Sequence, residues 1–126
     1  MKLLDPDNRF PIVLDDKCEQ PQANRPTFHG RVLSCRAWAA AYDAWLATYA
    51  PELSNVDMID QRLALAPQLI CGWQNVVDPA TGAARAFDPS VLADILTIEE
   101  FNELLTKALR QNRVSEDEVK NSDSQS

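Results

Sequence analysis

Apolar side chains that recur every three or four positions dominate the chain from Ser34 onward, and this spacing is typical of amphipathic helices. The first helix is predicted to begin after Ser34, because a serine hydroxyl at an N-cap accepts a hydrogen bond from a backbone amide of the first turn. It is predicted to run to about Tyr49, since Pro51 cannot continue a helix. One face of this helix is rich in aromatic residues, and its members are Trp38, Ala41, Trp45 and Tyr49.

Three further helices are predicted where a capping residue precedes an apolar-periodic segment. The three capping residues are Ser54, Asp88 and Thr97. Thr97 forms a full capping box with Glu100, because each side chain can accept a hydrogen bond from the other residue's backbone amide. Gly72 is expected to end the first of these helices, since glycine adopts the left-handed conformation without a steric penalty. The last helix is expected to run to about residue 111.

The N-terminal part of the chain follows a different pattern, in which apolar and polar residues alternate as they do in a half-buried strand. Residues 9–14 and 27–33 are the two expected strands, and we predict that they pair as a hairpin. Pro11 places the first strand at an edge, because its nitrogen cannot donate a hydrogen bond to a neighbouring strand. The polar, proline-marked residues 15–26 between them are expected to form a long, mobile loop.

The expected fold class is therefore mainly α. We predict a single small domain of four to five helices with a short N-terminal β-hairpin, at the margin of the α+β class. A chain of 126 residues has the length of one ordinary domain. The globular domain is expected to span residues 9–114 and to follow a flexible N-terminus, residues 1–8. The polar segment 115–126 is expected to be largely disordered, because its end offers no apolar side chain.

The charge balance disfavours two classes of partner. The chain has 12 basic and 19 acidic residues, which gives a net charge of −7 with histidine neutral. A surface of that sign repels nucleic-acid phosphates and anionic lipid head groups, so we expect neither nucleic acid nor a membrane as a partner. The first residues lack the apolar run of a signal peptide, so the protein is expected in the cytoplasm.

Residues that often carry catalysis or bind metals are scarce in this chain. His29 is the single histidine, so no histidine pair is available to hold a metal or relay a proton. Cys18, Cys35 and Cys71 lack the close spacing of a zinc site. The three glycines are too few for a phosphate-binding loop. We therefore expect no catalytic residue, no metal and no cofactor, and we predict that the protein is not an enzyme.

Aromatic residues are the best candidates for a functional surface. The helix around Trp38 places large rings beside small alanines, and such a ridged surface suits the docking of a partner helix. The alternative interpretation assigns Trp38 and Trp45 to the hydrophobic core. The predicted partner-binding residues are Trp38, Ala41, Tyr42, Trp45 and Trp73.

Several short motifs follow one another in a characteristic order along residues 9–120. The most telling pair is a Gly72-Trp73-x-x-Val76-x-Asp78 turn and a later helix that begins with Thr97-x-x-Glu100. The other motifs are Arg9-Phe-Pro-Ile-Val-Leu-Asp, Arg25-Pro-Thr-Phe, Leu33-Ser-x-Arg-x-Trp38, Phe87-Asp-Pro-Ser and Leu92-x-x-x-Leu96, with a polar tail of Ser and Asp. This arrangement resembles the small tail assembly chaperones of long-tailed bacteriophages, which also occur in prophages.

The resemblance implies a non-catalytic chaperone that binds and solubilises the tail tape measure protein while the phage tail is assembled. That partner is a very long helical protein with apolar stripes, which the chaperone covers until tail tube subunits displace it. The tail tube protein is thus a second candidate partner. Two other functions remain open, namely a structural head–tail joining or tail completion protein of the phage particle and a small acidic regulatory binding protein. The oligomeric state also remains open.

Overall fold

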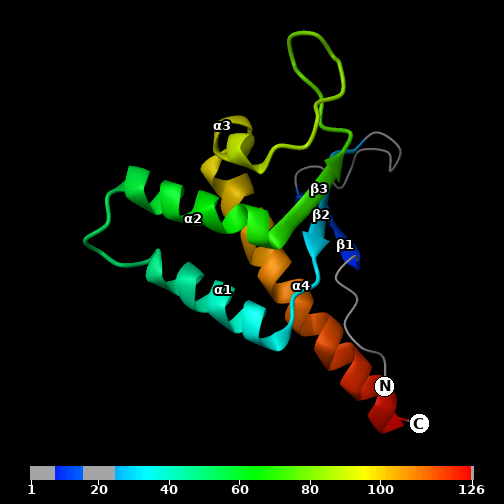
Figure 1. The fold of residues 1–126 in the computed structure, drawn as a ribbon. Helices are drawn as coiled ribbons and strands as arrows, with labels where there is room; N and C mark the ends of the chain where they lie inside the picture. Colours follow the sequence, from blue (N-terminus) through cyan, green and yellow to red (C-terminus); the bar gives the residue numbers. More distant parts are fainter. Residues whose placement is uncertain (1–7, 16–24, 126) are drawn as a thin grey trace.

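The computed structural model describes residues 8–15 and 25–125, and of residues 113–125 it describes the backbone alone. Within these residues the chain forms a small α+β fold of four α-helices, a short 3-10 helix and a three-stranded antiparallel sheet (Figure 1). In chain order the elements are β1 (Arg9–Ile12), β2 (Thr27–Arg31), α1 (Cys35–Ala47), α2 (Asn55–Leu69), β3 (Ile70–Gln74), η2 (Pro89–Val91), α3 (Leu92–Ile95) and α4 (Ile98–Gln125). Residues 1–7 of the predicted flexible N-terminus and most of the predicted mobile loop lie outside the described residues.

Three of the four predicted helix starts are confirmed by their capping hydrogen bonds, whereas the fourth capping residue, Asp88, caps the 3-10 helix η2 and not an α-helix. The Ser34 hydroxyl accepts from the amide of the third residue after it at 3.1 Å, and the Ser54 hydroxyl does the same at the start of α2. Thr97 and Glu100 form the complete capping box, with bonds of 3.0 and 3.2 Å between each backbone amide and the other residue's side chain. Each bond satisfies an amide that the helix itself leaves without a partner.

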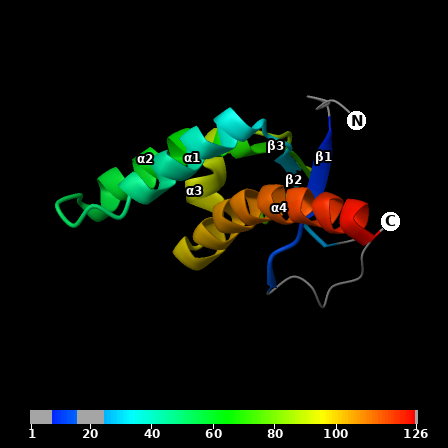
Figure 2. The same ribbon diagram turned by 90° about the horizontal axis from the view of Figure 1, so that it is seen from below.

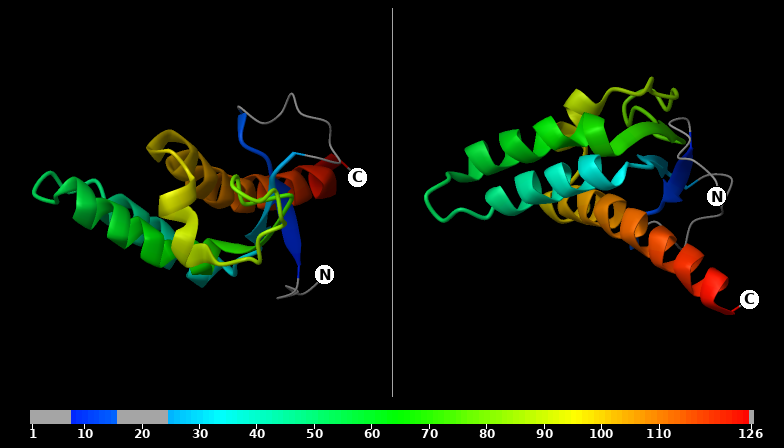
Figure 3. Two further views of the ribbon diagram at one scale, coloured as in Figure 1. Left: turned by 90° about the horizontal axis from the view of Figure 1, so that it is seen from above. Right: turned by 60° about the horizontal axis from the view of Figure 1, so that its bottom comes forward.

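Helices α1 and α2 form a pair that projects away from the sheet (Figures 1 and 2). The right-hand view of Figure 3 shows α1 between α2 and α4, and α1 contacts both of these helices. The strands lie at the other end of the α1–α2 pair, beside α4. This arrangement leaves one long side of α1 without a covering element among the described residues.

The sheet has the order β1-β2-β3, and both strand pairs are antiparallel. Pro11 lies opposite His29 in the edge strand β1, as the sequence predicts from its missing amide hydrogen. Phe10 lies opposite Gly30, and a side chain added at Gly30 would overlap the Phe10 ring. The absence of a side chain at Gly30 therefore lets the Phe10 ring lie across the neighbouring strand.

The prediction that Gly72 ends a helix is wrong. Helix α2 ends at Leu69, two residues after Pro67, and the chain passes directly into β3. Gly72 lies inside this strand, opposite His29 of β2. The expected two-stranded hairpin is thus part of a three-stranded sheet, because the third strand is brought to β2 by a contact between residues far apart in the sequence.

The prediction that the last helix ends near residue 111 is also wrong, because α4 continues to Gln125. No glycine or proline occurs in α4, so nothing in its sequence stops the helix. Residues 115–125 of the expected disordered tail have a helical backbone as the last part of α4. In Figure 1 this part of the helix extends past the sheet.

The hydrophobic core gathers residues from the sheet and from all three long helices. Helix α4 contributes the largest share, because its buried residues recur at the three- and four-residue spacing of one helical face. The buried apolar residues are Ile12, Leu14, Phe28, Ala41, Trp45, Leu65, Ala66, Leu69, Ile70, Leu92, Phe101, Leu104, Leu105, Ala108 and Leu109.

Candidate helix-binding groove

Helix α1 buries one face and exposes the side next to it. Ala41 and Trp45, one turn apart, are 2% and 5% exposed. Tyr42 and Leu46 each follow one of them by a single residue, which turns the side chain by about 100° around the helix, and they are 38% and 49% exposed. The exposed side therefore keeps an aromatic ring and an aliphatic side chain at the surface.

Trp38 fixes the start of α1 against the later part of α4. Its indole nitrogen donates to the backbone carbonyl of Leu109 at 3.0 Å. Its ring stacks on Tyr42, with centroids 5.1 Å apart and planes 11° from parallel. Because the polar atom of the indole is satisfied inside the domain, the two stacked rings present an apolar surface.

A pocket of about 240 Å³ opens between α1 and α4 beside these rings. Its walls come from two helices whose positions are fixed by the core, so the pocket exists without a bound partner. We call it the α1–α4 groove. It is lined by Trp38, Tyr42, Trp45, Thr106, Leu109 and Arg110.

Arg62 supports the groove from behind, although no sequence pattern predicts this role. Its side chain is 3% exposed, and its guanidinium carbon lies 4.5 Å from the Trp45 ring centroid and 4.8 Å from that of Tyr49. It donates to the Thr48 hydroxyl and to the Asn102 side-chain oxygen, both at 2.8 Å. The guanidinium thus ties α1, α2 and α4 together, which sequence periodicity cannot reveal.

The structure brings three of the five predicted partner-binding residues together. Trp38, Tyr42 and Trp45 line the α1–α4 groove, although Trp45 is mostly a core residue. Ala41 lies between them in the sequence but is buried on the core side of α1. The aromatic stripe therefore spans the boundary between the core and the surface.

Trp73 lies in a different cluster, so no contact places it in the groove. It is in β3, where its ring makes edge-to-face contacts with Phe28 at 6.2 Å and Phe87 at 5.1 Å. Its indole nitrogen donates to the carbonyl of Arg85 at 2.8 Å. Residue type alone groups Trp73 with the helix residues, and its place in a strand separates it from them.

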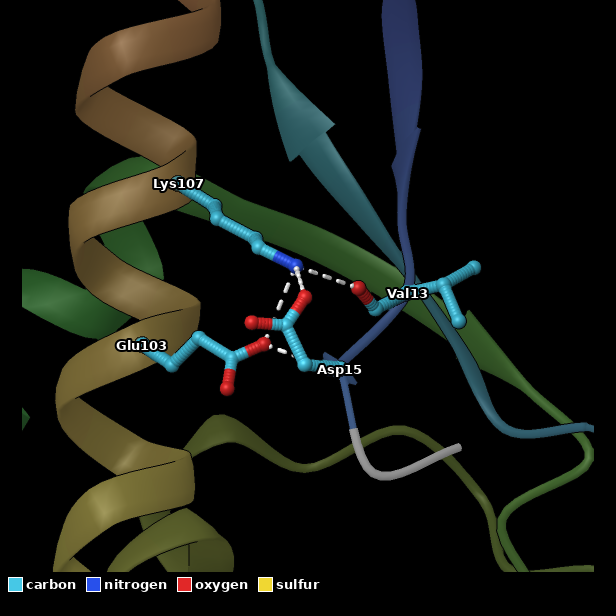
Figure 4. Close-up of polar contacts among 4 residues, drawn as sticks. All are labelled: Val13, Asp15, Glu103 and Lys107. Atoms are coloured by element: carbon cyan, nitrogen blue, oxygen red, sulfur yellow. Dashed lines mark hydrogen bonds and ion pairs between the residues drawn. The ribbon is translucent and has the colours of Figure 1, made fainter. Parts of the chain in front are cut away.

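On another side of α4, a polar clamp holds the segment that follows β1 (Figure 4). The Lys107 ammonium donates to the Val13 carbonyl and to the Asp15 carboxylate at 2.8 Å, and lies 3.0 Å from Glu103. The Asp15 amide donates to Glu103 at 2.7 Å. Burial lowers the pKa of Lys107, but the two carboxylates outweigh it, and the net direction is upward. This clamp holds the residues on either side of Leu14, whose side chain is buried in the core.

Two larger pockets, each of about 470 Å³, lie elsewhere. One is lined by Leu14, Phe28 and Val76 among others. The other lies between the starts of α2 and α4, beside Met58 and Ile98. Neither is lined by a residue that the sequence predicts for partner binding.

The candidates for metal or acid–base chemistry remain scattered. Within the described ranges, no group of three or more His, Cys, Asp or Glu side chains gathers as a metal site would require. Burial, followed by the nearby charge of Arg9, lowers the pKa of His29. Across residues 8–15 and 25–125, no helix has the length and apolar character needed to cross a membrane.

No protein-family model, no curated protein and no solved structure matches this chain.

Proposed function

We propose that this chain is a non-catalytic binding protein that holds an apolar helix of its partner in the α1–α4 groove. The observation that carries the proposal is the position of Tyr42. Its ring stacks on Trp38 at the edge of an open pocket and stays 38% exposed. Exposed apolar surface beside a preformed groove is typical of a protein-interaction site.

The exposed apolar surface continues along α1 beyond the pocket. Leu46 lies one turn after Tyr42, and Tyr49 is 61% exposed just after the end of the helix. Helix α1 has only two charged residues, Arg36 and Asp43. A surface with so few charges and several exposed apolar side chains suits an apolar helix better than a polar ligand.

The resemblance to tail assembly chaperones suggests which partner this is. A tail tape measure protein is long and helical, and its apolar stripes would otherwise associate with one another. We therefore propose that the chain binds and solubilises the tail tape measure protein in the bacterial host cytoplasm, with the tail tube protein as a second partner. The net charge of −7 supports this role, because like charges keep the complexes apart in solution.

Co-expression with a tail tape measure protein, followed by pull-down and light scattering, tests the proposal. The informative variant is Tyr42→Ser, because the exposed ring can be removed without emptying the core. Val56→Ser is the matched control, since Val56 is a 69% exposed apolar residue of α2 outside the groove lining. We expect a soluble stoichiometric complex that Tyr42→Ser weakens about tenfold and Val56→Ser leaves intact.

Other outcomes contradict the proposal and point to the alternatives. A chain that binds no tape measure protein and assembles into a closed ring would be a structural head–tail joining or tail completion protein. A chain that captures a basic protein, with an affinity that falls steeply as salt is added, would be an acidic regulatory protein. Equal weakening by Tyr42→Ser and Val56→Ser would place the binding surface elsewhere.

A further inference from the structure

The charges around the α1–α4 groove differ in sign from those of the chain as a whole. The net charge is −7, yet among the described residues that line the groove only Arg110 is charged. Its side chain is exposed at the surface of α4. In the part of the chain described with side chains, Arg110 forms no ion pair.

Lys107, the cation that precedes Arg110 in α4, forms ion pairs within the fold. Lys107 is three residues before Arg110 and is paired with Asp15 and Glu103, at 2.8 and 3.0 Å. Arg110, about one helical turn later, lines the groove, and among the side chains that the structure describes it is not part of these ion pairs. Because Arg110 is the charged residue in an otherwise uncharged groove lining, it offers a complementary site for a carboxylate from outside.

A second cation lies behind the floor of the groove. Arg62 stacks on Trp45, which lines the groove, and its two hydrogen bonds go to neutral oxygens of Thr48 and Asn102. No carboxylate among the described residues pairs with it. Its positive charge therefore lies behind the groove without an ion-pair partner among the described residues.

The geometry points to a partner helix with a defined charge pattern, an inference that rests on the function proposed above. We propose that the helix held in the α1–α4 groove has an apolar stripe flanked by a carboxylate that pairs with Arg110. Helix α1 has 13 residues and so offers a surface of about 20 Å, or about four helical turns. Because Trp38 bonds to Leu109, the residue before Arg110, the carboxylate lies at the Trp38 end of this surface.

The test measures the affinity of the complex formed with the tail tape measure protein, using the full chain. Arg110→Gln removes the charge and Arg110→Glu reverses it. Arg36→Gln is the matched control, because Arg36 is an exposed arginine on α1 that does not line the groove. We expect Arg110→Gln to weaken binding about fivefold, Arg110→Glu to weaken it further, and Arg36→Gln to leave it within twofold.

A charge exchange identifies the partner residue. Each carboxylate of the bound tape measure segment is changed to lysine, and one of these changes is expected to restore affinity for the Arg110→Glu variant. A wild-type complex that tolerates Arg110→Glu would overturn the charge pairing and leave the proposed function standing. Failure of the wild-type chain to form any complex would instead overturn the proposed function, and with it this inference.

Discussion

The guanidinium of Arg62 lies 4.5 Å from the centre of the Trp45 ring, and both side chains are buried at the junction of α1, α2 and α4. The same guanidinium is 4.8 Å from the Tyr49 ring and is hydrogen-bonded to Thr48 and Asn102. A cation over aromatic rings in a place with little water makes a stronger contact than one at the surface. The pair therefore holds the three helices that shape the groove.

Replacing Arg62 by methionine is expected to lower the free energy of unfolding by about 2 kcal/mol, since the oxygen of Asn102 loses its charged donor and both rings lose the cation. Arg62→Lys keeps the charge but lacks the planar group and the forked donors, so it is also expected to destabilise the fold. Urea denaturation followed by tryptophan fluorescence measures both changes. A methionine variant as stable as wild type would show that the cost of burying the charge cancels its contacts.

Gly30 is required where the Phe10 ring crosses it. A methyl group at this position would overlap the ring, so Gly30→Ala is expected to cost about 1–2 kcal/mol of stability. The overlap disappears when the ring is removed, so the cost should be smaller in a Phe10→Ala background. A double-mutant cycle measures this coupling. Additive effects of the two substitutions would contradict the contact.

Lys107 anchors the segment after β1, and its three contacts are expected to contribute unequally to the free energy of unfolding. Lys107→Met leaves the Val13 carbonyl without this donor and removes the ion pair, so we expect a loss of about 1–2 kcal/mol. Asp15→Asn is the control, because the Asp15 side chain is 80% exposed and its ion pair is expected to contribute less than about 0.5 kcal/mol. Thermal denaturation of both variants gives the comparison. A larger loss for Asp15→Asn than for Lys107→Met would contradict this order.

The lowered pKa of His29 predicts how stability depends on pH. Burial and the charge of Arg9 disfavour the protonated ring in the folded chain, so the unfolded chain takes up the proton first as the pH falls. Stability is therefore full above the ordinary histidine pKa of about 6.5 and decreases as the pH drops through it. Denaturation at pH 8, 7 and 6 is expected to show this decrease in wild type and a smaller one in His29→Gln. A wild-type chain that becomes more stable at pH 6 would contradict the prediction.

The local signals in the sequence predict the helix starts well. Ser34, Ser54 and Thr97 cap helices through hydrogen bonds to residues three positions away. A short stretch of sequence is therefore enough to predict each of these helix starts. The edge position of Pro11 is predicted for the same reason, since a missing amide hydrogen is a property of that residue alone.

The features that sequence alone missed depend on distant contacts. Gly72 is a good helix terminator locally, but its pairing with His29 makes it part of a strand. Trp73 belongs with Phe28 and Phe87, not with the tryptophans of α1. Arginine is a residue type that usually lies at the surface, and only the packing of three helices shows that Arg62 is buried. In the groove, the sequence identified the aromatic wall from α1, whereas the wall from α4 required the structure.

The central claim, that the α1–α4 groove holds the partner, is tested most directly by photo-crosslinking in cells that also produce the tail tape measure protein. The photoreactive residue p-benzoylphenylalanine is placed at Tyr42, in the groove, or at Gln61, an exposed position on α2 outside the groove lining. We predict a crosslink to the tape measure protein from position 42 and none from position 61. A complex that forms but crosslinks from position 61 and not from position 42 would contradict the account.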